Sequence, residues 1–461
     1  MTKPLKNNLF GLSGSVKDQL AQKMLEKRLK KVTEAQMSNK AAEPDVKRSR
    51  KSLLANSKIP DEFCRFDQFP GYQQIRILET GGKQMGVKSP FFKTHEGVAR
   101  NTTQIAGQEY INFASYNYLD LCGHPEVSQA AKDAIDKYGT SASASRPVAG
   151  ERPIQRELEQ ELAKLYDVDD AIVFVSGHAT NVTTIGYLFG PKDLILHDSL
   201  IHNSIVQGGQ LSGATRLPFP HNDWQALDEI LFQQRKKYER VLIVIEGIYS
   251  MDGDYPDLKR FIEIKQRHKA FLMVDEAHAL GVLGERGHGL KEQAGVDGHE
   301  VDLWMGTLSK TLASCGGYIA GENALIEHLK FSAPGFLYSV GIAPPVAASA
   351  LAALKLLDKE PERVHTLNKR GKQFLTLARK HGLNVGSSAG LSVIPIITGS
   401  SAMAGRLANA LFERGINVQP IFYPAVQEGM ARLRFFICSS HSEQQIEQTI
   451  AILVEEMAHL S

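Results

Sequence analysis

The sequence predicts an α/β protein with one large, mostly parallel sheet and a smaller α+β unit at its C-terminal end. Between residues 171 and 307, short apolar runs alternate with helical patterns, which is typical of parallel sheets built from β/α units. The runs at residues 241–246 and 271–275 are apolar at nearly every position, as expected for central strands covered on both faces. With 461 residues, 43% of them hydrophobic, the chain can bury a sizeable core.

The large unit is predicted to begin with a strand at residues 109–114 and a turn at 117–121. Helices follow at residues 127–138 and 153–166, where apolar positions recur at helical spacing. The expected strands of the large sheet lie at residues 171–175, 193–197, 215–218, 241–246, 271–275 and 303–307.

A long helix rich in Ala and Leu over residues 344–357 leads out of the large unit. The smaller unit is expected to contain strands near residues 391–398 and 431–436 and a closing helix at 443–460. The predicted organisation is therefore an N-terminal extension, a leading segment, a large α/β domain and a small C-terminal domain, at residues 1–60, 61–110, 111–350 and 351–461.

The extension is strongly basic, with 14 Lys and Arg against 5 Asp and Glu, whereas the remaining 401 residues carry 39 against 46. Ser15 is suited to cap a helix that runs to about Met37. Such a helix could dock on an acidic carrier protein, a partner subunit or an anionic membrane surface. The alternative is a solvated helix and linker, because runs of charge are often simply solvated.

The composition excludes several classes of protein. No run of 18 apolar residues is present, and the N-terminus lacks the apolar region of a secretion signal. The four cysteines, Cys64, Cys122, Cys315 and Cys438, form no CxxC pair, so neither a disulfide framework nor a metal site is expected. We therefore expect a cytoplasmic protein that uses no metal and binds no nucleic acid.

Two strand ends carry residues suited to catalysis. Lys310 follows the strand at residues 303–307 and precedes small residues that allow close approach to a ligand; partial burial there would favour the reactive free amine. Asp275 ends the strand at 271–275, at the sheet edge where ligands of α/β proteins gather. A cationic partner is expected for this carboxylate. A protonated pyridine nitrogen would serve, and His278 could bind a phenolic oxygen on the same ring.

Two further segments could hold other parts of such a ligand. Residues 175–181 (VSGHATN) read as a strand followed by a helix, whose first backbone N–H groups could bind a phosphate. His202, after another strand, could lie flat on an aromatic ring. A ring cation for Asp275, a phosphate for this turn and an aldehyde for Lys310 together describe pyridoxal 5′-phosphate.

The order of these motifs resembles that of the fold-type I pyridoxal-phosphate enzymes. Within them the chain is similar to the α-oxoamine synthases, a family that includes 8-amino-7-oxononanoate synthase, 2-amino-3-ketobutyrate ligase and serine palmitoyltransferase. The resemblance covers roughly residues 90–455. It is carried by residues 115–119 (SYNYL), 176–177 (SG), 246–254 (EGIYSMDGD), 275–278 (DEAH), 307–310 (TLSK) and 431–434 (ARLR).

The resemblance implies catalytic roles for several of these residues. Lys310 would carry the cofactor as a Schiff base and later move the Cα proton of an amino acid. Asp275 would hold the pyridinium and His278 the neighbouring oxygen. His202 would stack on the ring and orient the substrate carboxylate.

Other residues would bind the rest of the cofactor and the substrate. The expected cofactor ligands besides those above are Ser176, Gly177, His178, Ser250, Thr307 and, from a second subunit, Ser339. Arg434 would bind the amino-acid carboxylate, a task suited to its fork of donors, with Asn117 nearby. Arg432, two residues earlier on the same strand face, is the rival for that role.

The resemblance thus implies a homodimer with shared active sites that condenses serine, alanine or glycine with an acyl thioester, releasing CO₂ and thiol. Another fold-type I reaction, such as transamination or aldol-type cleavage, remains the alternative, and a non-catalytic binding module is a more distant one. Whether the donor is coenzyme A or a carrier protein stays open, as does the acyl length.

Three positions depart from the family pattern. Asp120 replaces a glycine, and His178 stands where many relatives have an aromatic residue. Phe422 replaces an arginine of the oxononanoate synthases, which argues against a pimeloyl donor. Residues 143–147, 221–224 and 423–426 look most like members that serve polyketide or lipid assembly, where the donor may be an acyl carrier protein.

Overall fold

The computed structural model describes residues 59–84, 86–423 and 425–460, together with the single positions 23 and 27. Apart from these two positions, the predicted helix from Ser15 to about Met37 lies outside the described residues, as does nearly all of the basic extension. Among the helices that are described, none combines the length and apolar character needed to cross a membrane.

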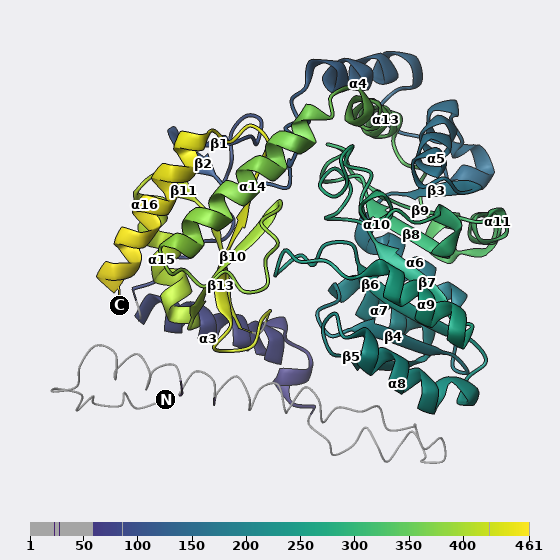
Figure 1. The fold of residues 1–461 in the computed structure, drawn as a ribbon, viewed down its shortest axis with the longest axis horizontal. Coiled ribbons are helices and arrows are strands. Elements are labelled where there is room, and N and C mark those ends of the chain that lie inside the picture. The colour runs from purple at the N-terminus through teal and green to yellow at the C-terminus, as the bar shows by residue number, and fades with distance from the viewer. Residues whose placement is uncertain (1–22, 24–26, 28–58, 85, 424, 461) are drawn as a thin grey trace.

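A seven-stranded sheet with the order β3-β9-β8-β7-β6-β4-β5 lies at the centre of the large unit (Figure 1). Its strands are β3 (Asp170–Phe174), β4 (Leu194–Asp198), β5 (Thr215–Phe219), β6 (Val241–Glu246), β7 (Phe271–Asp275), β8 (Leu303–Thr307) and β9 (Gly317–Gly321). Only β9 runs antiparallel to its neighbours in this sheet. The mostly parallel sheet and its six predicted strands are confirmed, but β9 was not predicted.

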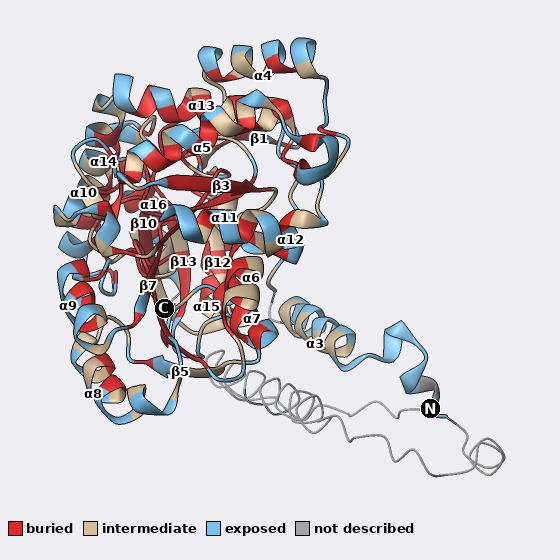
Figure 2. Cartoon of the chain, turned by 90° about the vertical axis from the view of Figure 1, so that its right-hand side faces the viewer, coloured by how far each residue is buried: buried red, intermediate tan, exposed pale blue. Residues whose placement is uncertain are grey.

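Helices cover both faces of this sheet, because alternate strand residues enter two different apolar clusters. In β3, which is buried along its whole length (Figure 2), Ile172 faces one cluster and Val173 the other. One face is covered by α6 (Gly177–Leu188), α7 (Asn203–Ser212) and α11 (Asn323–Ser332). The other is covered by α5 (Pro153–Tyr166), α8 (Trp224–Gln234), α9 (Leu258–His268) and α13 (Pro344–Lys359).

Two smaller sheets lie beside the large one. One has the order β10-β13-β12, formed by Val393–Gly399, Ala431–Phe436 and Gln419–Ile421. The other has the order β1-β2-β11, formed by Thr102–Ile105, Gln108–Asn112 and Ile416–Asn417. Their helices are α14 (Glu362–Lys380), α15 (Ser401–Glu413) and α16 (Glu443–Leu460), the last as predicted. Since β2 pairs with β11, the leading segment joins the C-terminal part, and the proposed domain boundaries stay a prediction.

The remaining helices are shorter or lie at the periphery. They are α3 (Pro70–Gln84), α4 (Pro125–Tyr138), α10 (Leu290–Ala294) and α12 (Pro334–Leu337), with single turns at Asp61–Phe63, Phe66–Gln68, Arg146–Gly150, Arg235–Lys237 and Gly298–Glu300.

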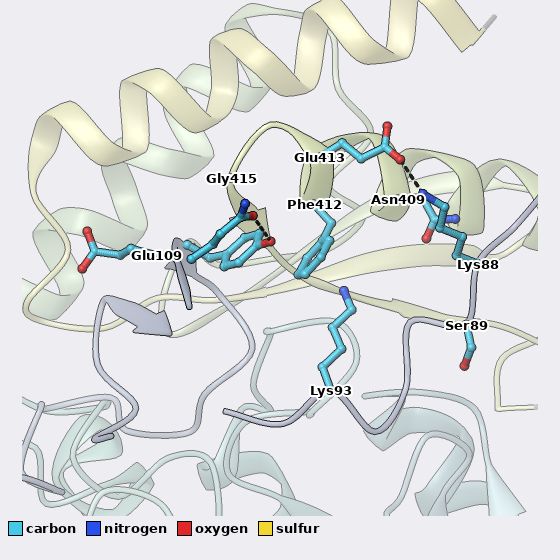
Figure 3. Close-up of a pocket in the computed structure, with 10 residues that line it drawn as sticks. Lys88, Ser89, Lys93, Glu109, Asn409, Phe412, Glu413 and Gly415 are labelled. Atoms are coloured by element: carbon cyan, nitrogen blue, oxygen red, sulfur yellow. Dashed lines mark hydrogen bonds and ion pairs between the residues drawn. The ribbon is translucent and has the colours of Figure 1, made fainter. Parts of the chain in front are cut away.

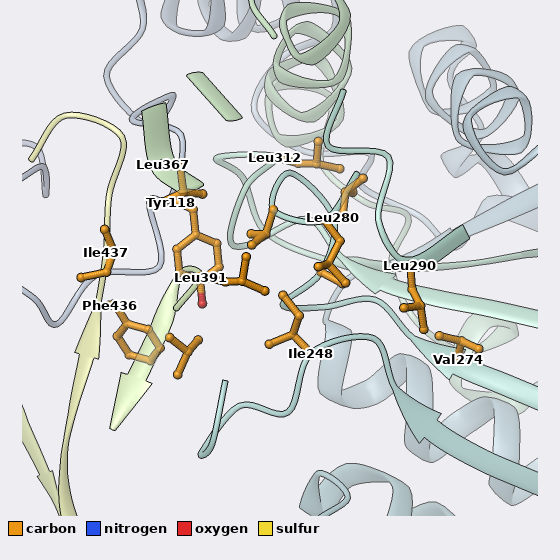
Figure 4. Close-up of a cluster of buried hydrophobic side chains, with 14 of the residues drawn as sticks. Tyr118, Ile248, Val274, Leu280, Leu290, Leu312, Leu367, Leu391, Phe436 and Ile437 are labelled. Atoms are coloured by element: carbon orange, nitrogen blue, oxygen red, sulfur yellow. The ribbon is translucent and has the colours of Figure 1, made fainter. Parts of the chain in front are cut away.

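One apolar cluster connects the C-terminal sheet with the large sheet. Figure 4 shows it running from Phe436 and Tyr118, through Leu391 and Leu280, to Val274 on β7. All of these side chains are buried. The packing therefore fixes the end of β13 relative to the carboxyl end of β7, where the predicted site residues lie.

Asp120 occupies a position whose backbone favours glycine. Its φ is 56°, in the left-handed region, which glycine adopts without strain. The buried Asp120 carboxylate compensates by pairing with the Arg100 guanidinium, whose Nε lies 3.0 Å from both oxygens. Asn117 also donates to this carboxylate at 3.3 Å, so the turn at 117–122 is held by side-chain contacts rather than by glycine.

We expect Asp120→Gly to be more stable than Asp120→Ala by about 1 kcal/mol. Both variants lose the contacts with Arg100, but only glycine adopts the left-handed backbone without strain. The difference is measured as the shift in thermal unfolding midpoint between the two variants. Equal midpoints would contradict the interpretation of backbone strain.

His221, which lies just after β5, joins the end of β4 to the loop after β6. Its Nδ1 lies 3.0 Å from Oδ1 of Asp198, and its Nε2 lies 2.9 Å from Oδ2 of Asp254. Burial alone would lower the pKa of His221, but the two carboxylates raise it to about 10. The imidazole is therefore a cation at neutral pH, held between two anions.

This arrangement predicts a pH-dependent stability. The pKa of His221 is higher in the folded than in the unfolded protein. The charged imidazole therefore stabilises the folded state fully below the unfolded pKa of about 6.5, and this stabilisation is lost as the pH rises to about 10. Between these two pH values, the loss of this stabilisation should lower the free energy of unfolding by up to about 1.4 kcal/mol per pH unit. His221→Gln should be less stable at pH 7 by about 3 kcal/mol and should show a shallower loss toward pH 10. Unfolding in urea at both pH values tests this, and parallel pH profiles would refute it.

Candidate active site

Asp275 lies at the carboxyl end of β7, in register with Glu246 of β6 and Met305 of β8. Its buried carboxylate accepts hydrogen bonds from Asn181 Nδ2 at 2.9 Å and from the N–H of Ala277 at 3.0 Å. In the described part of the chain, this carboxylate forms no ion pair with Lys, Arg or His. A buried anion satisfied only by neutral donors is suited to a cationic ligand, as predicted.

His278 is buried three residues later, where its Nδ1 lies 2.7 Å from the hydroxyl of Tyr118. Burial lowers the pKa of His278 well below its usual value, and the charges of Lys310 and Arg434 lower it further. The imidazole is therefore neutral, and Tyr118 fixes the orientation of its ring. Tyr118 was not predicted as a site residue, and no spacing in the sequence pointed to it.

Lys310 follows β8 and is partly buried. Burial lowers the pKa of its ammonium group to about 8, although Asp275 and Glu246 oppose the shift. Its Nζ lies 5.6 Å from the ring centre of Tyr116. Lys310, Tyr116 and Asn117 line a cavity of about 290 Å³. At neutral pH an amine with this pKa is unprotonated for part of the time, and that fraction can act as a nucleophile or base.

The predicted phosphate turn opens α6. Ser176 caps this helix by accepting from the N–H of Ala179 at 3.4 Å, and Gly177 is its first residue. A Cβ at Gly177 would lie 2.9 Å from Oγ1 of Thr307, so only glycine lets the helix start approach β8 this closely. Backbone donors and the Thr307 hydroxyl therefore meet in one small cradle, which fits a phosphate.

His178 is exposed and contacts Gln207, with Nε2 3.1 Å from Oε1. Its ring meets the ring of His202 edge to face, with the centres 6.3 Å apart. His202 caps α7 and is exposed. The structure therefore places the start of α6 beside the predicted stacking histidine.

The two candidate arginines differ in their partners. Arg432 is buried and is held by Asp252 Oδ1 at 2.6 Å and the Met251 carbonyl at 2.9 Å. Arg434 donates from Nη1 to the Ser250 carbonyl at 3.1 Å, while its buried Nε has no partner. Its guanidinium lies 4.6 Å from the ring centre of Phe436. The side chain with donors still available is therefore Arg434.

Asn117, Ser250 and Ser339 occupy different surroundings. The Asn117 amide is engaged in its own turn, donating to Ala99 O at 2.9 Å and accepting from Cys122 N–H at 3.0 Å, although it lines the Lys310 cavity. Ser250 is buried beside Arg434. Ser339 lies in a separate small crevice with Arg146, and its predicted role, which requires a second subunit, stays a prediction.

Glu246 is a buried carboxyl group that sequence reasoning did not assign. Burial raises its pKa well above the usual value, and the neighbouring Asp275 adds to the shift. Oε2 accepts the N–H of Ser250 at 3.3 Å, and Oε1 has no partner. The raised pKa favours the protonated form of Glu246 beside Asp275.

A larger cavity of about 550 Å³ lies away from Lys310, between residues 88–93, β2 and α15. Figure 3 shows Lys93 pointing toward Phe412, with Nζ 3.2 Å from the ring centre, and the ion pair between Lys88 and Glu413. It contains none of the predicted site residues.

The residues that surround Lys310 fit pyridoxal 5′-phosphate. Asp275 is available to pair with a cationic ring nitrogen. The cradle at Gly177 is suited to bind a phosphate, and the amine of Lys310 is suited to react with an aldehyde. The sequence identified all three, but it missed Asn181 and Ser204, which connect Asp275 with His202 through hydrogen bonds. The four-residue spacing of Gly177 and Asn181 on one helix face could have pointed to Asn181.

Comparison with known proteins agrees with this site. The family model for aminotransferase class I and II matches residues 108–453. The 8-amino-7-oxononanoate synthase of Symbiobacterium thermophilum is 36% identical over 371 residues, covering 80% of this chain and 94% of that protein. The enzyme of the same name from Fervidobacterium nodosum is 38% identical over 346 residues, covering 74% and 87%.

Solved structures show the same architecture. Serine palmitoyltransferase of Sphingomonas wittichii has a TM-score of 0.80 and 30% identity, covering 84% of this chain and 97% of its own. A structure of SPT with its PLP internal aldimine has a TM-score of 0.81 and 27% identity, covering 85% and 98%. The chain thus belongs to the aminotransferase class I and II family and, within it, to the α-oxoamine synthases, which are PLP-dependent acyltransferases that condense an amino acid with an acyl thioester and release CO₂.

Proposed function

We propose that this enzyme condenses serine, alanine or glycine with the acyl thioester of a fatty or polyketide-type chain to give an α-aminoketone. The observation that carries the proposal is the partner-free Nε of Arg434, buried next to Ser250 at the active site. A guanidinium with unused donors is suited to bind the carboxylate of an amino acid. The electrostatic effect of Arg434 on both Lys310 and His278 supports its placement among the reacting groups.

Bound PLP supplies an electron sink for the negative charge that develops at Cα of the amino acid. Lys310 is the proposed base for the Cα proton, because its lowered pKa leaves the amine unprotonated for part of the time at neutral pH. Asp275 is proposed to stabilise the ring cation, and His278 to contact the ring oxygen. His202 and Arg434 would together hold the amino acid so that its Cα–H bond faces Lys310.

The surroundings of Phe422 support a donor without a terminal carboxylate. Its ring packs edge to face against Phe91, with the centres 6.1 Å apart, and lies close to Gly405 of α15. These apolar neighbours offer no donor for an acyl chain that ends in a carboxylate. The proposed donor therefore differs from the pimeloyl group implied for the oxononanoate synthases.

A homodimer with shared sites is proposed on the surroundings of Ser339. Tyr338 is 87% exposed and Val340 is 49% exposed, so apolar side chains flank this serine on the surface of one chain. A second copy that covered them would bury apolar area.

We also propose that a carrier protein delivers the acyl group. The basic composition of residues 1–60 supports this proposal, because opposite charges would attract an acidic carrier protein to that segment.

Incubation with amino acids and acyl thioesters tests the proposed function. With PLP and serine, alanine or glycine, we expect thiol release from a long-chain acyl thioester and an α-aminoketone of the corresponding mass. Turnover with pimeloyl thioester should be at least tenfold lower. Lys310→Ala is the control and should lower the rate by at least about 10³-fold, because it removes the proposed base. Keto-acid formation without a thioester would instead indicate an aminotransferase.

The two arginines should give opposite results. Arg434→Ala should raise the KM for the amino acid by roughly ten- to a hundredfold, since it removes a charge-assisted contact of about 1.5–3 kcal/mol, and should leave the thermal midpoint little changed. Arg432→Ala should lower the midpoint, because it leaves buried Asp252 without its partner. The measurements are amino-acid KM and thermal unfolding of both variants. A larger KM effect at Arg432 would assign the carboxylate to that residue.

A further inference from the structure

Four polar side chains, those of Asp275, Asn181, Ser204 and His202, form a continuous hydrogen-bonded series across the active site. Asn181 Nδ2 lies 2.9 Å from Oδ2 of Asp275 and 2.9 Å from Oγ of Ser204. The Ser204 hydroxyl lies 2.7 Å from Nδ1 of His202. Asn181 and Ser204 are at most 1% exposed, so water does not compete for the two contacts of the Asn181 amide.

The directions of these hydrogen bonds follow from the chemistry of the groups. An ionised carboxylate only accepts, so the amide of Asn181 must present its NH₂ group to Asp275. That NH₂ group has a second hydrogen, which points to Ser204 Oγ. The Ser204 hydroxyl therefore accepts from Asn181, and its own hydrogen is left to donate to His202 Nδ1.

The backbone supports the same direction independently. The N–H of Ser204 also points at His202 Nδ1, at 3.3 Å, in the N-cap of α7. A hydrogen on Nδ1 would face this N–H directly. Both contacts therefore require Nδ1 to be an acceptor, and a neutral imidazole must then carry its hydrogen on Nε2.

We propose that Asn181 and Ser204 are positioning residues that hold His202 as the tautomer with its proton on Nε2. In the described residues Nε2 has no hydrogen-bond partner, so its N–H can donate to the substrate. The assignment of the substrate carboxylate as that acceptor rests on the proposed function. Through the same series, the charge of Asp275 determines the direction of every hydrogen bond as far as His202.

The charges around His202 agree with a neutral ring. Burial lowers its pKa, the charge of Asp275 raises it, and Lys310, His178 and Arg434 lower it. Removal of the Ser204 hydroxyl would weaken the preference for an unprotonated Nδ1.

The tautomer can be measured directly in the resting holoenzyme. Protein labelled with ¹⁵N-histidine gives ring nitrogen signals that distinguish protonated from unprotonated nitrogens, and His202→Gln identifies the signals of His202. We expect an unprotonated Nδ1 and a protonated Nε2 near neutral pH. A proton on Nδ1 in the unaltered enzyme would overturn the proposal, whatever the variants do.

Variants test the two positioning residues. Ser204→Ala and Asn181→Asp should each raise the pH at which His202 titrates and raise the amino-acid KM about tenfold, with a smaller effect on kcat. Ser204→Thr keeps the hydroxyl and should restore the titration. Asn203→Ala is the matched control on α7, because Asn203 contacts Gln207 rather than the series. Unchanged His202 signals in both Ser204→Ala and Asn181→Asp would refute the roles of these residues.

The spectroscopic result does not depend on turnover. If no condensation occurs but His202 carries its proton on Nε2 and responds to Ser204→Ala, the positioning roles hold and only the proposed substrate is wrong. If condensation occurs and the tautomer is reversed, the positioning roles are wrong and the proposed function stands.

Discussion

The hydrogen bonds from Asn181 and Ala277 hold the Asp275 carboxylate in the interior of the protein, at the end of β7. A buried carboxylate costs several kcal/mol unless it is well satisfied, and two neutral donors leave much of its charge uncompensated. The neighbouring carboxyl group shows the effect of this carboxylate. Burial and the adjacent Asp275 raise the pKa of Glu246, its neighbour in register, well above the usual value, because two adjacent buried charges of the same sign would be more costly still.

The cationic side chains of the site show the complementary effect. Burial lowers the pKa of the Lys310 amine more than Asp275 and Glu246 raise it, so the pKa falls to about 8. His278 is kept neutral by burial and by the neighbouring cations. Arg434 remains charged at any ordinary pH. The site thus combines the buried carboxyl group of Asp275, the guanidinium of Arg434 and an amine that can exchange a proton, the three groups to which the proposed condensation assigns roles.

Strand-end patterns predicted the sheet, which is confirmed, and they predicted that Asp275, His278 and Lys310 lie at one edge, because parallel strands end there. The catalytic roles of these three residues stay predictions. β9 was missed because a short Gly-rich segment that runs antiparallel has no distinctive pattern. The choice between Arg432 and Arg434 was undecidable from the sequence, since alternate residues share one strand face. Only the packing of residues 250–252 against β13 separates them. Asn181 and Ser204 are single polar residues on helices, and their contacts depend on how α6 and α7 pack together.

The parallel pairing of β2 with β11 has a consequence for biosynthesis. Residues 111–112 bond to residues 416–417, so this sheet cannot be completed until roughly 300 more residues have left the ribosome. At typical elongation rates of about 5–20 residues per second, β1 and β2 wait on the order of 15–60 s for their partner. During that interval the hairpin exposes an unpaired edge in the nascent chain, a stage at which we expect chaperone contact to matter most.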